Sequence, residues 1–190
     1  MRIKDDKKQE ALFLATIKLV NEIGFAASSV AKIAGEAGVS PATLYIYFRN
    51  KEDLLVSTYL AIKRDMSVAV LDGLDETQPV RDILHNIWLR MFAHISLNKA
   101  EFRYAEQFAN SPFKQLVNIQ EVHGYFAPLI RVIQRGIEQK IIKDVPFEIL
   151  AAFMFHPVMT LANQKVCTDI ELDSQDIEIS FQLSWDAIKL

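Results

Sequence analysis

Residues 30–55, VAKIAGEAGVSPATLYIYFRNKEDLL, hold two short helical patterns with a glycine-containing turn between them. Ser29 stands before the first pattern as a helix cap, and Gly38 ends it. Ser40 caps the second pattern, and Pro41 takes its first position, where a missing N–H costs nothing. Two short helices joined in this way predict a helix-turn-helix, whose second helix enters the major groove of DNA.

The second helix of this motif, predicted over residues 41–48, offers mostly small groups on its outer side. They are hydroxyls, a methyl and two phenols: Ser40, Ala42, Thr43, Tyr45 and Tyr47. Because serine and threonine hydroxyls pair with several bases, these side chains predict no operator sequence. Lys51, at the start of the next helix, offers an ammonium to a phosphate beside the backbone amides of that helix.

The rest of the chain shows the spacing of helices, and six Gly and six Pro are too few for a turn-rich β-sandwich. We expect an all-α fold of about nine helices. Residues 1–50 form a DNA-binding head of three helices, and residues 51–190 form a body that includes a connector helix over 51–71. Within the body, we predict one long helix from Pro112 to about Ile142, bent near Gly124 and Pro128. A further helix is predicted to follow it and to end near Val166.

Composition excludes several classes of protein. The 190 residues are 51% apolar and 24% charged, which excludes disorder as the main state. The single cysteine, Cys167, excludes an internal disulfide framework and a zinc site with several cysteines. No run approaches the roughly 18 apolar residues of a membrane span, and the charged start MRIKDDKKQE lacks the apolar part of an export signal. We therefore expect a cytoplasmic protein without membrane contact.

Charge is distributed unevenly along the chain. Residues 1–51 hold eight basic and five acidic side chains, whereas the remainder holds 13 basic and 19 acidic ones. A basic head on an acidic body favours contact between the head and a polyanion. An ordinary solvated surface carries a similar excess, so the charge alone leaves both interpretations open.

The body lacks the signatures of an enzyme or a metal site. Its four histidines are His85, His94, His123 and His156. They form no metal-binding pair, and no nucleophile-elbow, Walker or dinucleotide-binding motif occurs. We expect neither catalysis nor a cofactor, while binding of a small ligand or metal by one of the histidines stays open.

Aromatic and methionine side chains concentrate in the body, where they either fill a core or line a cavity for an apolar ligand. The predicted ligand-binding residues are Trp88, Met91, Phe92, His94, Phe102, Gln107, Phe108 and Phe126. Such a lining favours a hydrophobic or amphipathic effector over a sugar or nucleotide.

Residues 30–55 closely resemble the N-terminal signature of the tetracycline-repressor (TetR-type) family of bacterial transcription regulators. The matching elements are Ile33-Ala34, Ala37-Gly38-Val39-Ser40, Thr43-Leu44-Tyr45, Tyr47-Phe48 and Asn50-Lys51-Glu52-Asp53-Leu54-Leu55. The resemblance implies base and backbone contacts by Ser40, Thr43, Tyr45 and Tyr47, a phosphate contact by Lys51, and backbone contacts by Ser28 and Ser29. Ala31, Gly35 and Glu36 depart from the polar or basic residues common there. A basic arm over residues 2–8 would compensate, unless it is a solvated tail.

The resemblance also implies a homodimer through the last two helices, a palindromic DNA operator, and a small-molecule effector. An apolar stripe in the last helix (Ile177, Phe181, Trp185 and Ile188) and a second stripe in the preceding helix (Phe147, Leu150, Met154, Val158 and Leu161) are predicted to pair with a second copy. Repression rather than activation follows from the family alone, since no residue decides it. The alternative from another class is a helical protein–protein adaptor, which would bind no DNA site.

Overall fold

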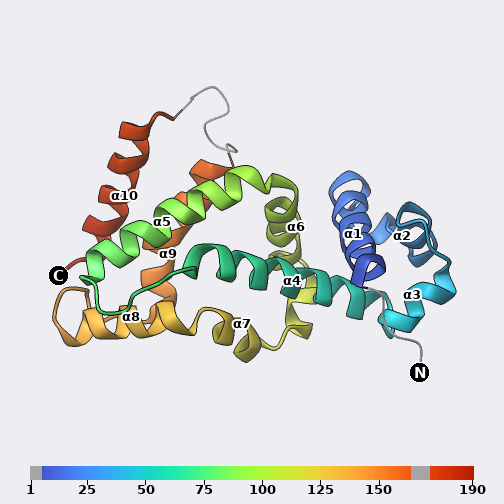
Figure 1. The fold of residues 1–190 in the computed structure, drawn as a ribbon, viewed down its shortest axis with the longest axis horizontal. Coiled ribbons are helices and arrows are strands. Elements are labelled where there is room, and N and C mark those ends of the chain that lie inside the picture. The colour runs from blue at the N-terminus through green and yellow to red at the C-terminus, as the bar shows by residue number, and fades with distance from the viewer. Residues whose placement is uncertain (1–5, 164–171) are drawn as a thin grey trace. The chain divides into compact units, whose positions relative to one another are not determined.

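The computed structural model describes residues 6–163 and 172–190. Within these ranges the chain forms ten α-helices and one 3-10 helix, and a single bridge between Ile142 and Lys189 is the sole β-type pairing (Figure 1). The all-α fold predicted from the sequence is confirmed. The arm at residues 2–4, Cys167 and the helix end expected near Val166 lie outside the described residues.

The helix bounds follow the chain in order. They are α1 (Asp6–Ala27), α2 (Val30–Glu36), α3 (Pro41–Tyr47), α4 (Lys51–Leu71), α5 (Val80–Leu97), α6 (Lys99–Ala109), the 3-10 helix η1 (Pro112–Leu116), α7 (Ile119–Tyr125), α8 (Ala127–Glu138), α9 (Phe147–Ala162) and α10 (Ser174–Ile188).

The prediction of one long helix from Pro112 to Ile142 is wrong, because this segment forms η1, α7 and α8. Pro128 lies in the first turn of α8. A proline has no N–H to donate to the preceding turn, so it begins a new helix here rather than bending an old one. Lys140 then takes a left-handed φ of 56° directly after α8. That conformation ends the helix before Ile142.

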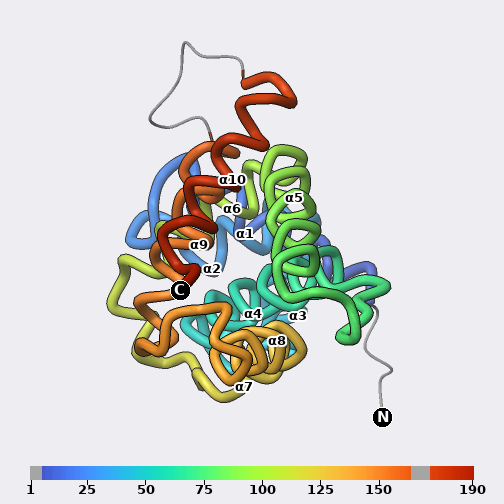
Figure 2. Tube along the Cα trace, turned by 90° about the vertical axis from the view of Figure 1, so that its left-hand side faces the viewer, coloured from blue at the N-terminus to red at the C-terminus, as the bar shows by residue number. Residues whose placement is uncertain are grey.

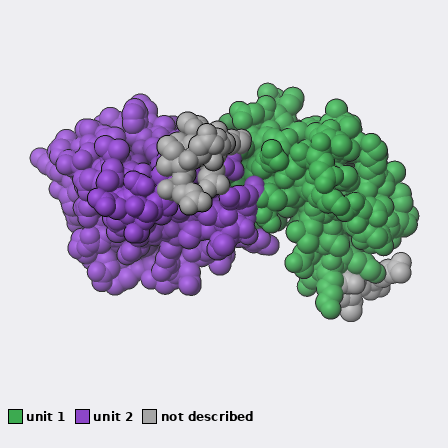
Figure 3. All heavy atoms as spheres, turned by 90° about the horizontal axis from the view of Figure 1, so that it is seen from above, with its two compact units in different colours: residues 1–63, 100–119 green, residues 64–99, 120–190 purple. Residues whose placement is uncertain are grey.

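Two compact units make up the chain, and Figure 3 colours them separately. Unit 1 comprises residues 1–63 and 100–119, and unit 2 comprises residues 64–99 and 120–190. α4 therefore begins in unit 1 and ends in unit 2, and α6 contributes nearly all of its length to unit 1.

Unit 1 has two buried apolar clusters. One lies under α2 and α3 and is described with the site below. The other joins α1, α4 and α6: Ile17, Val20, Leu55, Ile62, Tyr104, Ala105 and Phe108. Within it the Tyr104 hydroxyl donates a hydrogen bond of 2.8 Å to the Leu55 carbonyl. Burial raises the pKa of this phenol, so it stays a neutral donor that joins α6 to α4.

In unit 2, α5 packs against α8, α9 and α10, and α9 packs against α10. Figures 1 and 2 show α5, α9 and α10 lying side by side. Trp88 on α5 is fully buried, and its indole N–H donates to the Met154 carbonyl of α9 at 3.1 Å. Asp173 caps α10 through a reciprocal capping box with Asp176. These contacts fix the faces that α9 and α10 present to their own chain.

The apolar stripe expected to pair with a second copy is largely buried within the chain instead. On α10, Phe181, Trp185 and Ile188 are 0–6% exposed. The predicted stripe of α9 is buried at Leu150, Met154 and Val158 as well: each is at most 3% exposed. The prediction that these residues form the subunit contact is wrong, because the helices use this face to pack on each other and on α5.

None of the helices in the described ranges is both long and apolar enough to cross a membrane.

Candidate nucleic-acid interface

The helix-turn-helix of unit 1 stands on a buried cluster that α1, α2, α3 and α4 share. Its members are Leu12, Ala15, Ile33, Ala34, Leu44, Phe48 and Leu54. Ile33 and Ala34 hold α2 to the core, and Leu44 does the same for α3, each with no exposed surface. This packing determines which side of α3 faces away from the protein.

The turn between α2 and α3 depends on Gly38, which has a φ of +68°. Residues with a Cβ rarely adopt this conformation. The Val39 N–H donates to the Ala34 carbonyl at 2.9 Å, and the Gly38 N–H donates to the Gly35 carbonyl at 3.1 Å. The turn therefore satisfies the carbonyls at the end of α2 and directs the chain into α3.

The start of α3 is capped as the sequence predicts. The Ser40 hydroxyl oxygen accepts the Thr43 N–H at 3.1 Å, and it shares a second hydrogen bond of 3.0 Å with the Thr43 hydroxyl. Pro41 occupies the first turn. Ser40 and Thr43, whose hydroxyls are predicted to contact bases, are thus hydrogen-bonded to each other at the helix terminus.

The outer face of α3 consists of Ala42, Tyr45 and Ile46, which follow the i, i+3, i+4 spacing of one helix face. All three are exposed: Tyr45 to 55% and Ile46 to 46%. Tyr47 is half-buried against the cluster, with its ring 6.3 Å from that of Phe48. Sequence reasoning missed Ile46, although its place four residues after Ala42 puts it on the same face.

The two serines before α2 differ in their surroundings. Ser28 is fully buried, and its hydroxyl donates to the Gly24 carbonyl at 2.7 Å. Gly24 has a φ of 75° and interrupts the helical backbone of α1. Ser29 is exposed and accepts the Lys32 N–H at 3.3 Å as the cap of α2. The DNA contacts of Ser28 and Ser29 remain predictions. The Ser28 hydroxyl already donates its proton to the Gly24 carbonyl.

Glu36, the acid that departs from the family pattern, is paired within unit 1. Its carboxylate lies 2.6 Å from the Lys18 ammonium of α1. The hydrogen bond and the charge of Glu36 raise the pKa of Lys18. This pairing reduces the repulsion that an unpaired carboxylate on α2 would exert on a phosphate.

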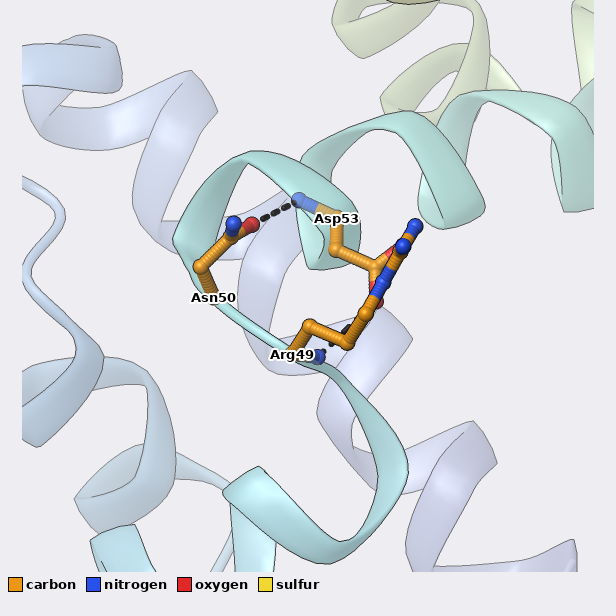
Figure 4. Close-up of polar contacts among 3 residues, drawn as sticks. All are labelled: Arg49, Asn50 and Asp53. Carbon is orange, nitrogen blue, oxygen red and sulfur yellow. Dashed lines mark hydrogen bonds and ion pairs between the residues drawn. The ribbon is translucent and has the colours of Figure 1, made fainter.

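The start of α4 carries a second set of polar contacts (Figure 4). The Asn50 side-chain oxygen accepts the Asp53 N–H at 2.7 Å, so Asn50 caps the N-terminus of α4. Asp53 in turn accepts the backbone N–H of Arg49 at 2.8 Å. The Lys51 ammonium donates to the Phe25 carbonyl at 2.5 Å. Since an ammonium has three donors, this bond holds Lys51 at the helix terminus and leaves it able to meet a phosphate.

The residues predicted to bind an effector are divided between the two units. Trp88, Met91, Phe92, His94 and Phe126 belong to unit 2, whereas Phe102, Gln107 and Phe108 belong to unit 1. In unit 2 the Trp88 and Phe92 rings stack at 6.1 Å. In unit 1 the Gln107 amide donates to the Asn21 side chain at 2.8 Å, and Phe108 stacks on Tyr59 at 4.5 Å. Their role in ligand binding stays a prediction.

Unit 2 contains a small cavity of about 100 Å³ beside the loop from α4 to α5. Its lining is Val70, Gly73, Leu74, Asp75, Gln78, Ile83, Asn86, Ile87 and Arg90. None of the predicted ligand-binding residues contributes to this cavity. Its volume is below the roughly 300 Å³ of a typical small-molecule site. Within the described residues, no three His, Cys, Asp or Glu side chains are grouped as metal ligands.

Two family models match the chain. The one described as "Bacterial regulatory proteins, tetR family" matches residues 12–58, which include the helix-turn-helix. The one described as "Tetracyclin repressor-like, C-terminal domain" matches residues 79–189, which is more than half of the chain.

Three proteins illustrate the similarity. A TetR-family transcription regulator from Marinobacter aquaeolei VT8 is 34% identical with a TM-score of 0.87, over 100% of this chain and 99% of that one. The "Fatty acid metabolism regulator protein" of Bacillus subtilis is 28% identical over 68% of each chain. The regulator FadR from Bacillus subtilis in complex with stearoyl-CoA shares the fold at 21% identity and a TM-score of 0.73, over 92% of this chain and 95% of that one. The chain belongs to the tetR family of bacterial regulatory proteins, and it is a helix-turn-helix transcriptional regulator rather than an enzyme.

Proposed function

We propose that this regulator is a homodimeric cytoplasmic repressor that a small, mostly apolar effector releases from a palindromic operator. Residues 1–50 bind the DNA, and residues 51–190 bind the effector and the second subunit. Each subunit places α3 in one major-groove half-site. Ser29, Thr43, Tyr45 and Lys51 are the residues that we expect to contact the duplex first, since each lies at a helix terminus or on α3.

The observation that carries the proposal is an exposed apolar face on α9 and α10. It consists of Ile149 and Phe153 on α9 and of Ile179 and Leu183 on α10, four residues apart on each helix. These side chains are 48%, 57%, 49% and 67% exposed. Four large exposed apolar groups on two helices that pack together favour a binding surface. We call this set the α9–α10 face.

A second copy of the chain suits the α9–α10 face. Two copies related by a two-fold axis would bury the same residues on both sides and form a four-helix bundle from α9 and α10. Two linked heads also bind one duplex more tightly than a single head does. A palindromic operator matches this symmetry, since each half-site meets one subunit.

The apolar effector is supported by residue chemistry and by two relatives. Trp88, Phe92 and Phe126 in unit 2 are aromatic, and Met91 in the same unit is pliable and apolar. A relative is named for fatty acid metabolism, and a protein of the same fold binds stearoyl-CoA. We therefore propose a molecule with a long acyl chain as the effector class. His94, in the same unit, is the polar contact that we expect to orient it.

Release of DNA requires coupling between the effector and the heads. α4 begins at the helix-turn-helix with the Asn50 cap and ends in unit 2 beside the cavity at Val70. A shift of its C-terminal end on effector binding would therefore change the placement of the heads. The coupling free energy of such systems is about 1–3 kcal/mol, and it is reciprocal, so operator DNA must weaken effector binding by the same factor.

Thermal shift assays with palmitate, stearate and stearoyl-CoA test this proposal, with glucose and AMP as polar comparators. We expect an acyl compound to raise the melting temperature and to lower affinity for the operator in fluorescence anisotropy. Saturating operator should weaken binding of that compound by the same factor. An acyl compound whose affinity is unaffected by operator would contradict its role as effector, and the absence of any stabilising acyl compound would contradict the effector class.

A further inference from the structure

The recognition helix α3 lacks the side chains that most often read bases in the major groove. Its seven residues, PATLYIY, include no charged, amide or imidazole group. Guanine is usually read by Arg or Lys, and adenine by Asn or Gln, through paired hydrogen bonds. α3 has none of these residue types, so its specificity needs another source.

The two aliphatic hydroxyls at the start of α3, those of Ser40 and Thr43, are already engaged with each other. The Ser40 hydroxyl accepts the Thr43 N–H and shares one hydrogen bond with the Thr43 hydroxyl. The nearby cations are held by backbone or carboxylate oxygens. Lys32 donates to the Ala27 carbonyl at 3.1 Å, and the Arg49 guanidinium lies 3.5 Å from the Asp53 carboxylate. These groups flank α3 and suit phosphate contacts, which carry no sequence information.

What α3 exposes is alkyl and phenol surface on one face. Ala42 offers a methyl group, Ile46 offers a branched alkyl chain that is 46% exposed, and Tyr45 offers a ring with a terminal hydroxyl. In the major groove the apolar feature of a base pair is the C5-methyl group of thymine, and small alkyl side chains contact it. We infer that α3 reads its half-site through thymine methyl groups, with Ile46 and Ala42 as the specificity-determining residues. The operator half-site would then hold A·T pairs where α3 contacts it.

This inference rests on the proposed operator binding, and one substitution in the DNA tests it separately. Replacing thymine by deoxyuracil removes the C5-methyl group and leaves base pairing intact. Burial of one methyl-sized group predicts about a fourfold loss of affinity per contacted thymine, or about 15-fold when the symmetric positions of both half-sites are replaced. Fluorescence anisotropy on an operator selected from genomic DNA, with one thymine position replaced at a time, measures the loss.

A protein variant completes the experiment. Ile46→Ala shortens an exposed side chain, so we expect the fold to persist and the penalty for deoxyuracil to disappear at the thymine that Ile46 contacts. Leu14→Ala, at a 55% exposed position on α1, should keep the full penalty and serves as the control.

The outcomes separate this inference from the proposed function. Specific binding with no loss on deoxyuracil substitution would overturn thymine reading and leave operator binding standing. A penalty that persists in full in Ile46→Ala would overturn the assignment to this residue. Failure to select any operator would overturn the proposed function, and the inference with it.

Discussion

Phe153→Ala should dissociate the proposed dimer. Phe153 is 57% exposed on the α9–α10 face, so a partner that covers it removes roughly 100 Å² of apolar surface from water. At about 25 cal/mol per Å² this burial stabilises the dimer by about 2 kcal/mol per subunit, after allowing for the Cβ that alanine keeps. The two-fold axis places the change twice in one interface, which gives about 4 kcal/mol. We therefore expect a dissociation constant about 1,000 times higher.

Sedimentation velocity over a wide range of protein concentrations measures this constant. Leu97→Ala is the matched control, because Leu97 is 84% exposed and lies at the end of α5, outside the α9–α10 face. It should leave the dissociation constant unchanged. A Phe153→Ala protein whose constant stays within twofold of the original would refute the reasoning. An equal effect of Leu97→Ala would show that exposed apolar area alone, rather than this face, drives association.

Three further predictions concern the helix cap, an ion pair and phosphate contact. Asn50→Ala removes the cap of α4 and should cost about 1 kcal/mol in urea denaturation, with the exposed first-turn acid Glu52 changed to alanine as a smaller-effect control. The hydrogen bond from Arg131 lowers the pKa of Glu76 from its ordinary 4.5, so this pair stabilises the protein above that pH and loses its effect as the pH falls through the lowered value. The free energy of unfolding lost in Glu76→Gln, measured by urea denaturation, should therefore be smaller at low pH. A loss unchanged at pH 3 would contradict this. Lys51→Ala should weaken binding to all DNA sequences alike and reduce the slope of log affinity against log salt by about 1 in anisotropy titrations. A change in sequence preference would contradict a phosphate contact.

Local signals explain why the helix-turn-helix was predictable from the sequence. Ser40 and Asn50 each cap the helix that follows, and their oxygens accept the N–H three residues ahead. Pro41 restricts φ to a value that suits the first turn of α3, and Gly38 permits the positive φ of the turn before it. Because these effects act within one turn, a single sequence suffices to place α2, α3 and the start of α4.

The side chains' partners were less predictable, because they depend on distant segments. The buried Ser28 hydroxyl donates a hydrogen bond to the Gly24 carbonyl, and Glu36 forms an ion pair with Lys18 on another helix. Nothing in the local pattern distinguishes these contacts from DNA contacts. The exposed Ile46 was missed because an apolar residue in a short helix is ordinarily assigned to the core.

The two C-terminal helices show a further limit of pattern reasoning. α9 is apolar on almost all sides, so its periodicity does not say which face meets its own chain. An i, i+4 stripe such as Phe181 and Trp185 predicts burial but not the partner that provides it. The structure assigns that stripe to the chain's own core, and the exposed positions Phe153 and Leu183 fall on another face.

Selection of bound fragments from genomic DNA, followed by the stoichiometry of the selected complex, tests the central claim most directly. A dimeric regulator predicts one enriched inverted repeat, with half-site centres about 34–36 Å or a multiple apart along the duplex. It also predicts two chains per duplex in sedimentation equilibrium. Enrichment of no sequence above non-specific background, or a specific complex with a single chain, would contradict the account.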